Sequence, residues 1–168
     1  DEFEIPTATL LDNSNPSVSS LNDGRFVVTW TDAGVRGRLY DSFGNTAGDE
    51  FQINSSGHDP SVASLSDGGF VVTWGSTTMA SDKGEIFGQR YDISGNTLGP
   101  EFQVNTYTTG FQTGSKVAGL TDGGFVVTWD SSISDWDTYD VYGQRYDSSG
   151  NTSGAEFQVN TYRANGHH

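Results

Sequence analysis

Cysteine is absent from this chain of 168 residues, and lysine and arginine together number only 8. Without cysteine, disulfides and thiolate metal sites are excluded. The scarcity of basic residues, with a formal net charge of −14 at pH 7, argues against nucleic acid and anionic membranes as partners, because both require a basic surface. No apolar run approaches the ~20 residues that a membrane-spanning helix needs, so we expect no membrane insertion.

The residues that are abundant favour strands and turns. The chain holds 22 glycines, and 12% of its residues are aromatic. Glycine suits turns, whereas aromatic and β-branched residues are typical of strands. The length is that of one ordinary domain with a hydrophobic core. An acidic surface also keeps a secreted protein soluble and attracts cations such as calcium.

A phrase of roughly 50 residues is repeated three times along the chain. Each copy contains "FVVTW", which ends at Trp30, Trp74 and Trp129, and each closes with "EFQ(I/V)N". "DEFEI" at the start resembles one more copy of that closing segment. We predict a single repeat domain over residues 1–162 and a tail at 163–168, whose final histidines we interpret as part of an affinity tag. The predicted divisions are repeat 1 at about 3–50, repeat 2 at about 51–101, repeat 3 at about 102–156 and a final strand at 157–162.

Each repeat is predicted to hold four short antiparallel strands. The first is "PSVSSL", "PSVASL" or "SKVAGL", and an Asp-Gly turn, which supplies the positive φ of a tight hairpin, connects it to "FVVTW". This second strand is continuously apolar, which indicates burial on both faces. The third strand is "IFGQRYD" or its equivalent, and a turn at "SGN" or "FGN" leads to "EFQVN", the fourth.

The predicted fold is all-β, with three four-stranded antiparallel repeats stacked as β-propeller-type blades. A sheet of four short strands cannot bury both faces alone, so neighbouring repeats must stack face to face. The alternative is a β-trefoil, which also has three repeats of four strands. The additional "DEFEI" segment favours blades, because a closed trefoil has no use for it. Three blades do not close a ring, so we expect either a homo-oligomer, with a dimer completing the propeller, or a longer array of repeats.

The phrases "DGGFVVTW", "GQRYDxSGN" and "EFQVNT" resemble the tandem repeats of very large secreted bacterial proteins, adhesins and surface proteins that often carry RTX-type calcium-binding nonapeptides. The resemblance extends from Phe3 to Tyr162. It implies an extracellular or cell-surface module without a catalytic signature. The first repeat departs from the pattern, because Arg25 stands where the others have glycine, and Arg38-Leu39 replaces Gln-Arg.

The stretch after each repeat's Trp varies between copies, which predicts a binding loop on a fixed scaffold. In the third repeat this stretch is "DSSISDWDTYD". Clustered carboxylates bind hard cations, so calcium is a candidate cofactor, although the loop lacks the order of an EF-hand. The alternative is a solvated acidic loop. The predicted metal ligands are Asp130, Asp135, Asp137 and Asp140.

The same loops suit a glycan or polysaccharide. Aromatic rings stack on the apolar face of a sugar, and carboxylates accept hydrogen bonds from its hydroxyls. The alternative for Trp136 is packing over the edge of a blade. The predicted ligand-binding residues are Trp136, Tyr139 and Asp135 in the third repeat and Asp82 and Glu85 in the second.

Other recurring residues are predicted to be structural. We expect the three "FVVTW" tryptophans in the core, and Arg90 and Arg145 in ion pairs with Asp92, Asp147 or the Glu of "EFQVN". No catalytic constellation stands out beside the lone internal His58, so we expect no enzyme. Two functions remain open, a secreted lectin-like or adhesin module that binds carbohydrate and a purely structural, self-associating repeat scaffold of a larger surface protein.

Overall fold

The computed structural model describes residues 13–77, 84–132 and 139–161, and it confirms the all-β prediction, since every element in these ranges is a strand. The predicted strand at "DEFEI" and the predicted tail at 163–168 lie outside the described residues. No helix in the described part of the chain is long and apolar enough to cross a membrane. The strands are β1 (Ser14–Ser20), β2 (Phe26–Thr31), β3 (Val35–Tyr40), β4 (Phe51–Asn54), β5 (Gly57–Ser64), β6 (Phe70–Thr77), β7 (Gly84–Tyr91), β8 (Thr97–Gln103), β9 (Phe111–Gly119), β10 (Phe125–Ser132), β11 (Asp140–Tyr146) and β12 (Phe157–Gln158).

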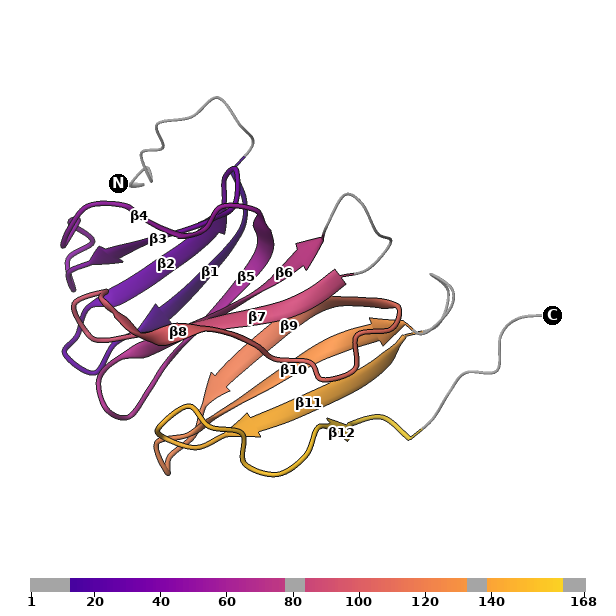
Figure 1. The fold of residues 1–168 in the computed structure, drawn as a ribbon. Helices are drawn as coiled ribbons and strands as arrows, with labels where there is room; N and C mark the ends of the chain where they lie inside the picture. The colour runs from indigo at the N-terminus through magenta and orange to yellow at the C-terminus, as the bar shows by residue number, and fades with distance from the viewer. Residues whose placement is uncertain (1–12, 78–83, 133–138, 162–168) are drawn as a thin grey trace.

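These strands form three four-stranded antiparallel meanders, termed blades (Figure 1). Blade 1 contains β1–β4, blade 2 contains β5–β8 and blade 3 contains β9–β12. Blades 2 and 3 are joined into one sheet by a single parallel pair, Gly84 with Phe111. The blades stack so that their first strands, β1, β5 and β9, lie next to one another, while the later strands lead outward.

Aspartate side chains fix two turns in each blade. In blade 2, Asp67 accepts a hydrogen bond from the backbone N–H of Gly69 at 2.9 Å, which closes the turn between β5 and β6. Asp92 accepts from the backbone N–H groups of Ser94 at 2.8 Å and Asn96 at 2.9 Å, in the turn between β7 and β8. The same contacts recur in blades 1 and 3, so the repeated "DG" and "YDxxGN" phrases are turn chemistry.

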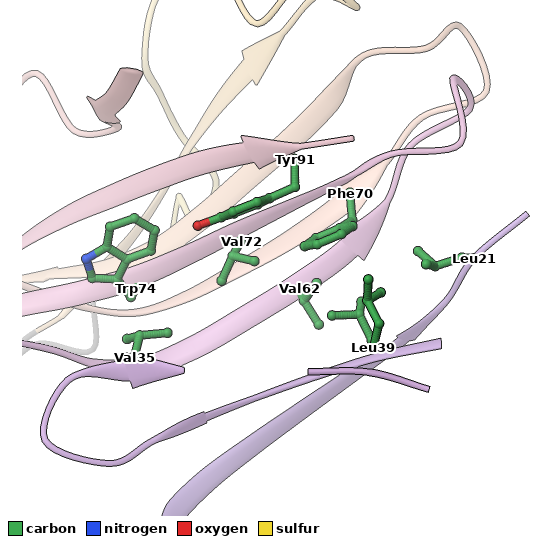
Figure 2. Close-up of a cluster of buried hydrophobic side chains, with 9 residues drawn as sticks. Leu21, Val35, Leu39, Val62, Phe70, Val72, Trp74 and Tyr91 are labelled. Carbon is green, nitrogen blue, oxygen red and sulfur yellow. The ribbon is translucent and has the colours of Figure 1, made fainter. Parts of the chain in front are cut away.

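The core lies between the blades, and "FVVTW" contributes to it from both faces, as predicted. In blade 2, Phe70 and Trp74 pack toward blade 1 (Figure 2). Val71 of the same strand packs toward blade 3. The predicted core position of Trp30, Trp74 and Trp129 is confirmed, since each is at most 3% exposed. The cluster between blades 1 and 2 comprises Leu21, Val27, Val35, Leu39, Val62, Phe70, Val72, Trp74 and Tyr91. The cluster between blades 2 and 3 comprises Ala63, Leu65, Val71, Ile86, Val104, Phe125, Val127, Trp129 and Tyr146.

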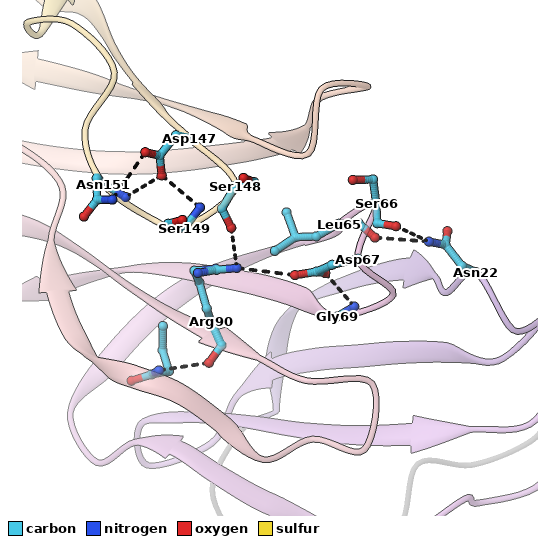
Figure 3. A network of polar contacts seen from close by, with 11 residues as sticks. Asn22, Leu65, Ser66, Asp67, Gly69, Arg90, Asp147, Ser148, Ser149 and Asn151 are labelled. Atoms are coloured by element: carbon cyan, nitrogen blue, oxygen red, sulfur yellow. Dashed lines mark hydrogen bonds and ion pairs between the residues drawn. The ribbon is translucent and has the colours of Figure 1, made fainter.

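Polar contacts also join each blade to the next. Arg90 donates a hydrogen bond from Nη2 to the backbone carbonyl of Ser148 at 2.8 Å and pairs with Asp67 at 3.4 Å (Figure 3). In blade 1, Arg25 makes the equivalent contact, from Nη2 to the carbonyl of Ile93 at 2.8 Å. Blade 1 thus contacts blade 2 as blade 2 contacts blade 3, although the arginine comes from a different position.

The predicted ion pairs of Arg90 and Arg145 exist, but their predicted partners were wrong. Arg145 pairs with Asp122, as Arg90 pairs with Asp67, so the partner is the aspartate of the Asp-Gly turn. The carboxylate of Asp92 is already occupied, since it accepts hydrogen bonds from two backbone N–H groups and from an asparagine amide within its own turn.

Candidate functional site

Each first strand carries a β-bulge at the same point. The pairing of β1, β5 and β9 with their second strands shifts register next to Asn15, Asp59 and Gly114. These three residues have φ values of +53°, +52° and +66°. Asparagine, aspartate and glycine are the residue types that best tolerate this left-handed backbone, which explains why the three repeats differ here in identity but share a conformation.

The bulges from all three blades line one open pocket of about 350 Å³. Its walls are residues 15–17 of β1, residues 59–61 of β5, and Gly114 and Lys116 of β9. Because the first strands lie at the centre of the stack, we term this feature the axial pocket. Its lining residues lie near the start of each first strand, at the edge of the blades where the second strands end.

The carboxylate of Asp59 is held between two blades at this pocket. One of its oxygens accepts a hydrogen bond from the side-chain amide of Asn15, and the other lies 3.1 Å from Nδ1 of His58. The backbone N–H of Asp59 donates to Oγ1 of Thr31 in blade 1 at 3.1 Å. The side chain of Asp59 is nevertheless 42% exposed, so its carboxylate is fixed in direction and open to solvent.

Backbone strain accompanies this arrangement. Asn15 and Asp59 both precede a proline, and the residue before a proline is normally restricted to extended conformations. A positive φ at such a non-glycine residue costs of order 1–3 kcal/mol and persists where the surroundings hold it in place. Strained residues of this kind concentrate at ligand sites, which makes the axial pocket the first candidate for function.

In blade 3, one lining residue and one neighbour of the lining are charged. Lys116 is exposed at the position that serine occupies in the other two repeats. Asp130 lies beside Gly114, where a Cβ would come within 3.0 Å of its Oδ2. Burial raises the pKa of Asp130 above its usual range. The pocket therefore combines hydrogen-bond donors, hydrogen-bond acceptors and one ammonium group.

The predicted metal ligands do not converge in the described part of the chain. Asp130 pairs with Val141 across β10 and β11, while Asp140 pairs with the next residue, Ser131. Successive residues of a strand point to opposite faces, so the two carboxylates lie on opposite sides of blade 3. Asp135 and Asp137 lie outside the described residues, and no group of three metal-ligating side chains occurs among the residues that are described.

Two predicted loop residues lie in third strands and bind the neighbouring "EFQVN" segments. Glu85 accepts hydrogen bonds from the amides of Asn105 and, at 3.2 Å, Gln103. Asp140, the equivalent residue of blade 3, accepts from the amide of Asn160 at 3.1 Å. Both asparagines end an "EFQVN" segment, and their Oδ1 atoms accept a backbone N–H of the third strand at 2.8 Å. The asparagine of the repeat therefore joins the end of the "EFQVN" segment to the start of the third strand, a role that sequence reasoning missed.

The remaining predicted ligand residues belong to the loops themselves. Tyr139 directly precedes β11, and its side chain is 39% exposed. Asp82, Asp135 and Trp136 lie outside the described residues. Sequence reasoning also missed the axial pocket, whose only signal was the "NPS", "DPS" and "GSK" triplet before the valine of each first strand.

Comparisons with known proteins place the fold. No family model matches the sequence, and no curated relative matches it. Among solved structures, the chain is similar to an endo-arabinase from Bacteroides thetaiotaomicron, with a TM-score of 0.54 at 17% identity over 87% of this chain and 61% of that one. It is also similar to a GH43 endo-arabinanase from Bacillus licheniformis, with a TM-score of 0.51 at 15% identity over 90% and 61%. A protein of unknown function from Bacteroides caccae matches with a TM-score of 0.51 at 11% identity over 94% and 50%.

These similarities establish the class of fold. The two arabinan-related structures are β-propellers, so the prediction of propeller-type blades is confirmed, and the β-trefoil alternative falls. The chain spans about half to three-fifths of the length of the structures it matches. At identities below 20%, the likeness concerns the fold alone, since one fold supports many functions.

Proposed function

We propose that the chain is a lectin-like or adhesin module that binds a polysaccharide at the axial pocket and the loops beside it. The observation that carries this proposal is the pocket of about 350 Å³, to which all three blades contribute polar side chains or backbone. Binding sites of propellers and other repeat folds are commonly built in this way, from equivalent segments of several repeats. The carbohydrate-related structural neighbours support the same class of ligand.

The chemistry of the pocket suits sugar hydroxyls. Each hydroxyl of a sugar both donates and accepts, so it needs neighbours of both kinds. Asp59 supplies a fixed acceptor, Lys116 supplies a donor, and the amide of Asn15 supplies either. Because Asp59 is already oriented by Asn15 and His58, little side-chain freedom is lost when a ligand binds. An open pocket favours a chain segment over a single enclosed sugar.

The proposed function includes calcium as a bound ion and an extracellular location. The net charge of −14 would favour cation binding near the acidic loop of blade 3 and suits an extracellular protein. Calcium would bind there through carboxylate and carbonyl oxygens, which hard cations prefer. We propose no catalysis, so a bound polysaccharide is expected to remain intact.

A second candidate function, the self-associating scaffold, is favoured by a different observation. The exposed large hydrophobic side chains in the described part of the chain include Val18 in blade 1 and Phe157 and Val159 in blade 3, at the two ends of the stack. Side chains at equivalent positions inside the stack contact a neighbouring blade.

A glycan array that includes arabinan, probed with and without a calcium chelator, tests the first candidate. We expect binding to at least one polysaccharide, with retention after chelation if the axial pocket dominates and loss if a calcium-bound loop is required. The same bound polysaccharide is assayed for new reducing ends, and none are expected. Absence of binding to any glycan in the presence of calcium would overturn the proposal.

A further inference from the structure

Each blade has two faces, and the two internal interfaces use them in the same way. The forward face packs on the next blade, and the backward face packs on the preceding one. Val104 marks the forward face of blade 2, and its equivalents are Ile53 and Val159. Val62 marks the backward face of blade 2, and its equivalent in blade 1 is Val18. The ends of the stack are the backward face of blade 1 and the forward face of blade 3.

Both end faces expose side chains that internal interfaces bury. On the forward side, Val159 is 51% exposed, whereas Val104 is 1% exposed. On the backward side, Val18 is 65% exposed, whereas Val62 is 6% exposed. Phe157, also on the forward face of blade 3, is 45% exposed. The two ends therefore expose peripheral apolar side chains whose equivalents are buried at the internal interfaces.

The arginine contact between blades is incomplete at the same end. The side chain of Arg90 is 12% exposed because blade 3 covers it, and it donates to the Ser148 carbonyl. Arg145, its equivalent, is 41% exposed. In blade 1, Ser42 occupies the position of Ser148. Arg145 could donate to the carbonyl of a Ser42 only if blade 1 of a second chain followed blade 3. The next residue of that turn, Phe43, is 88% exposed.

A hydrogen bond near the axial pocket gives a third correspondence between the two ends of the stack. Oγ1 of Thr31 accepts the backbone N–H of Asp59 from the next blade. Asp130 occupies the position of Thr31 in blade 3, and its carboxylate makes no hydrogen bond or ion pair with the described residues. Asn15 is the blade 1 equivalent of Asp59. A blade 1 placed after blade 3 would bring the N–H of Asn15 to the carboxylate of Asp130.

We propose that the forward face of blade 3 docks on the backward face of blade 1 of a second copy of this chain, and that two such contacts close a dimer. The proposal rests on the scaffold candidate and is independent of carbohydrate binding. Val28, Trp30 and Tyr40 on that backward face are already buried within the chain, so the second copy contacts the rim formed by Val18 and Phe43. Both halves of the contact are on one chain, which is why the partner is another copy.

One internal contact does not recur in this arrangement. The hydroxyls of Ser17 and Ser61 accept backbone N–H groups of the next first strand, from Val62 and Val117, each at 3.2 Å. Lys116 replaces this serine in blade 3, and an ammonium group cannot accept a hydrogen bond. The contact between copies therefore lacks the serine hydrogen bond that both internal interfaces contain, which suits a reversible association.

Complementation between two variants tests the head-to-tail geometry. The variant V18D places a charge on the backward face of blade 1, and V159D places one on the forward face of blade 3. Both valines are exposed, so we expect each monomer to fold normally. Light scattering should show a dimer for the unmodified chain and a monomer for each variant alone, with the dissociation constant raised at least ~100-fold by an unpaired charge at the contact. An equimolar mixture should form a one-to-one dimer, because each variant retains the end that the other lacks.

The control is L98D, which places the same charge on an exposed residue of β8 away from both ends and should leave the dimer intact. A monomer at every concentration of the unmodified chain would overturn the proposal. A dimer of V18D alone would also overturn it, since that result indicates a contact between two copies of the same face. Polysaccharide binding by V159D is measured in parallel, so that failure to associate and failure to bind carbohydrate are distinguished.

Discussion

Blade 1 and blade 2 contact their following blades through the same atoms but from different residues. Blade 2 uses Arg90 on its third strand, and Gly69 follows its Asp-Gly turn. Blade 1 has leucine at Leu39 in place of Arg90, and its arginine is Arg25, in place of that glycine. In both cases the guanidinium pairs with the aspartate of the Asp-Gly turn and donates to a carbonyl of the next blade.

The interface between blades is therefore repeated even where the sequence is not. Leu39 pairs with Val27, two residues from Arg25, so positions 25 and 39 lie near each other on the same face of the hairpin. Leu39 in exchange joins the apolar cluster between blades 1 and 2, where it is 4% exposed. The departure of the first repeat from its pattern is therefore a compensated exchange of two residues.

The largest expected effect comes from removing an apolar residue common to this interface. Trp74→Ala should lower the free energy of unfolding by about 3–5 kcal/mol, because it leaves a cavity between blades 1 and 2. Tyr107→Ala, at a side chain that is 45% exposed, should change it by less than about 0.5 kcal/mol. Urea denaturation of both variants measures the difference, and equal costs would contradict the assignment of the core.

A smaller effect tests the compensated exchange directly. Arg25→Gly should cost about 1–2 kcal/mol, because the carbonyl of Ile93 loses a charged hydrogen-bond donor at a partly exposed site. Adding Leu39→Arg to that variant recreates the pattern of blade 2 and should recover part of the loss. A double-mutant cycle measures the coupling between the two positions. If the effects of the two substitutions on the free energy of unfolding are strictly additive, positions 25 and 39 do not compensate for each other.

The smallest effect concerns the turns that the blades share. Hydrogen bonds from the side chain and backbone of Asn96 hold the pKa of Asp92 below its usual range. A carboxyl with a lowered pKa in the folded state stabilises the fold above its unfolded pKa of about 3.9, and this contribution is lost as the pH falls through the folded pKa. Asn96→Ala should raise the pKa of Asp92 and make stability less steeply dependent on pH below about 4. Carboxyl titration by NMR measures the shift, and an unchanged Asp92 pKa would contradict the assigned cause.

Strands and turns were predictable because their signals are local. The Asp-Gly and "YDxxGN" turns depend on residues within four positions of each other, and "FVVTW" identifies a strand buried on two faces by composition alone. The partner of Arg90 was not predictable, because Asp67 and Asp92 lie in turns at the same end of the strands. Only the structure reveals that one of these carboxylates is already satisfied.

The axial pocket depends on contacts that no local pattern contains. Asn15, Asp59 and Gly114 are separated by 44 and 55 positions, and they meet because each precedes the same bulge on a first strand. The sequence instead predicted ligand binding in the loops after each Trp, because these loops vary between repeats. Of the predicted residues there that the structure describes, Glu85 and Asp140 turn out to hold the outer strands.

Titration calorimetry with variants of the axial pocket shows whether a polysaccharide binds there. The polysaccharide is the one selected on the array, and the variant is Asp59→Ala, which removes a carboxylate held by Asn15 and His58. We predict at least a ~10-fold loss of affinity, because a fixed hydrogen bond to a charged group contributes about 1.5–3 kcal/mol. Asp49→Asn, at an exposed carboxylate between β3 and β4, is the control and should bind normally. Unchanged affinity in Asp59→Ala would show that the polysaccharide does not bind at the axial pocket.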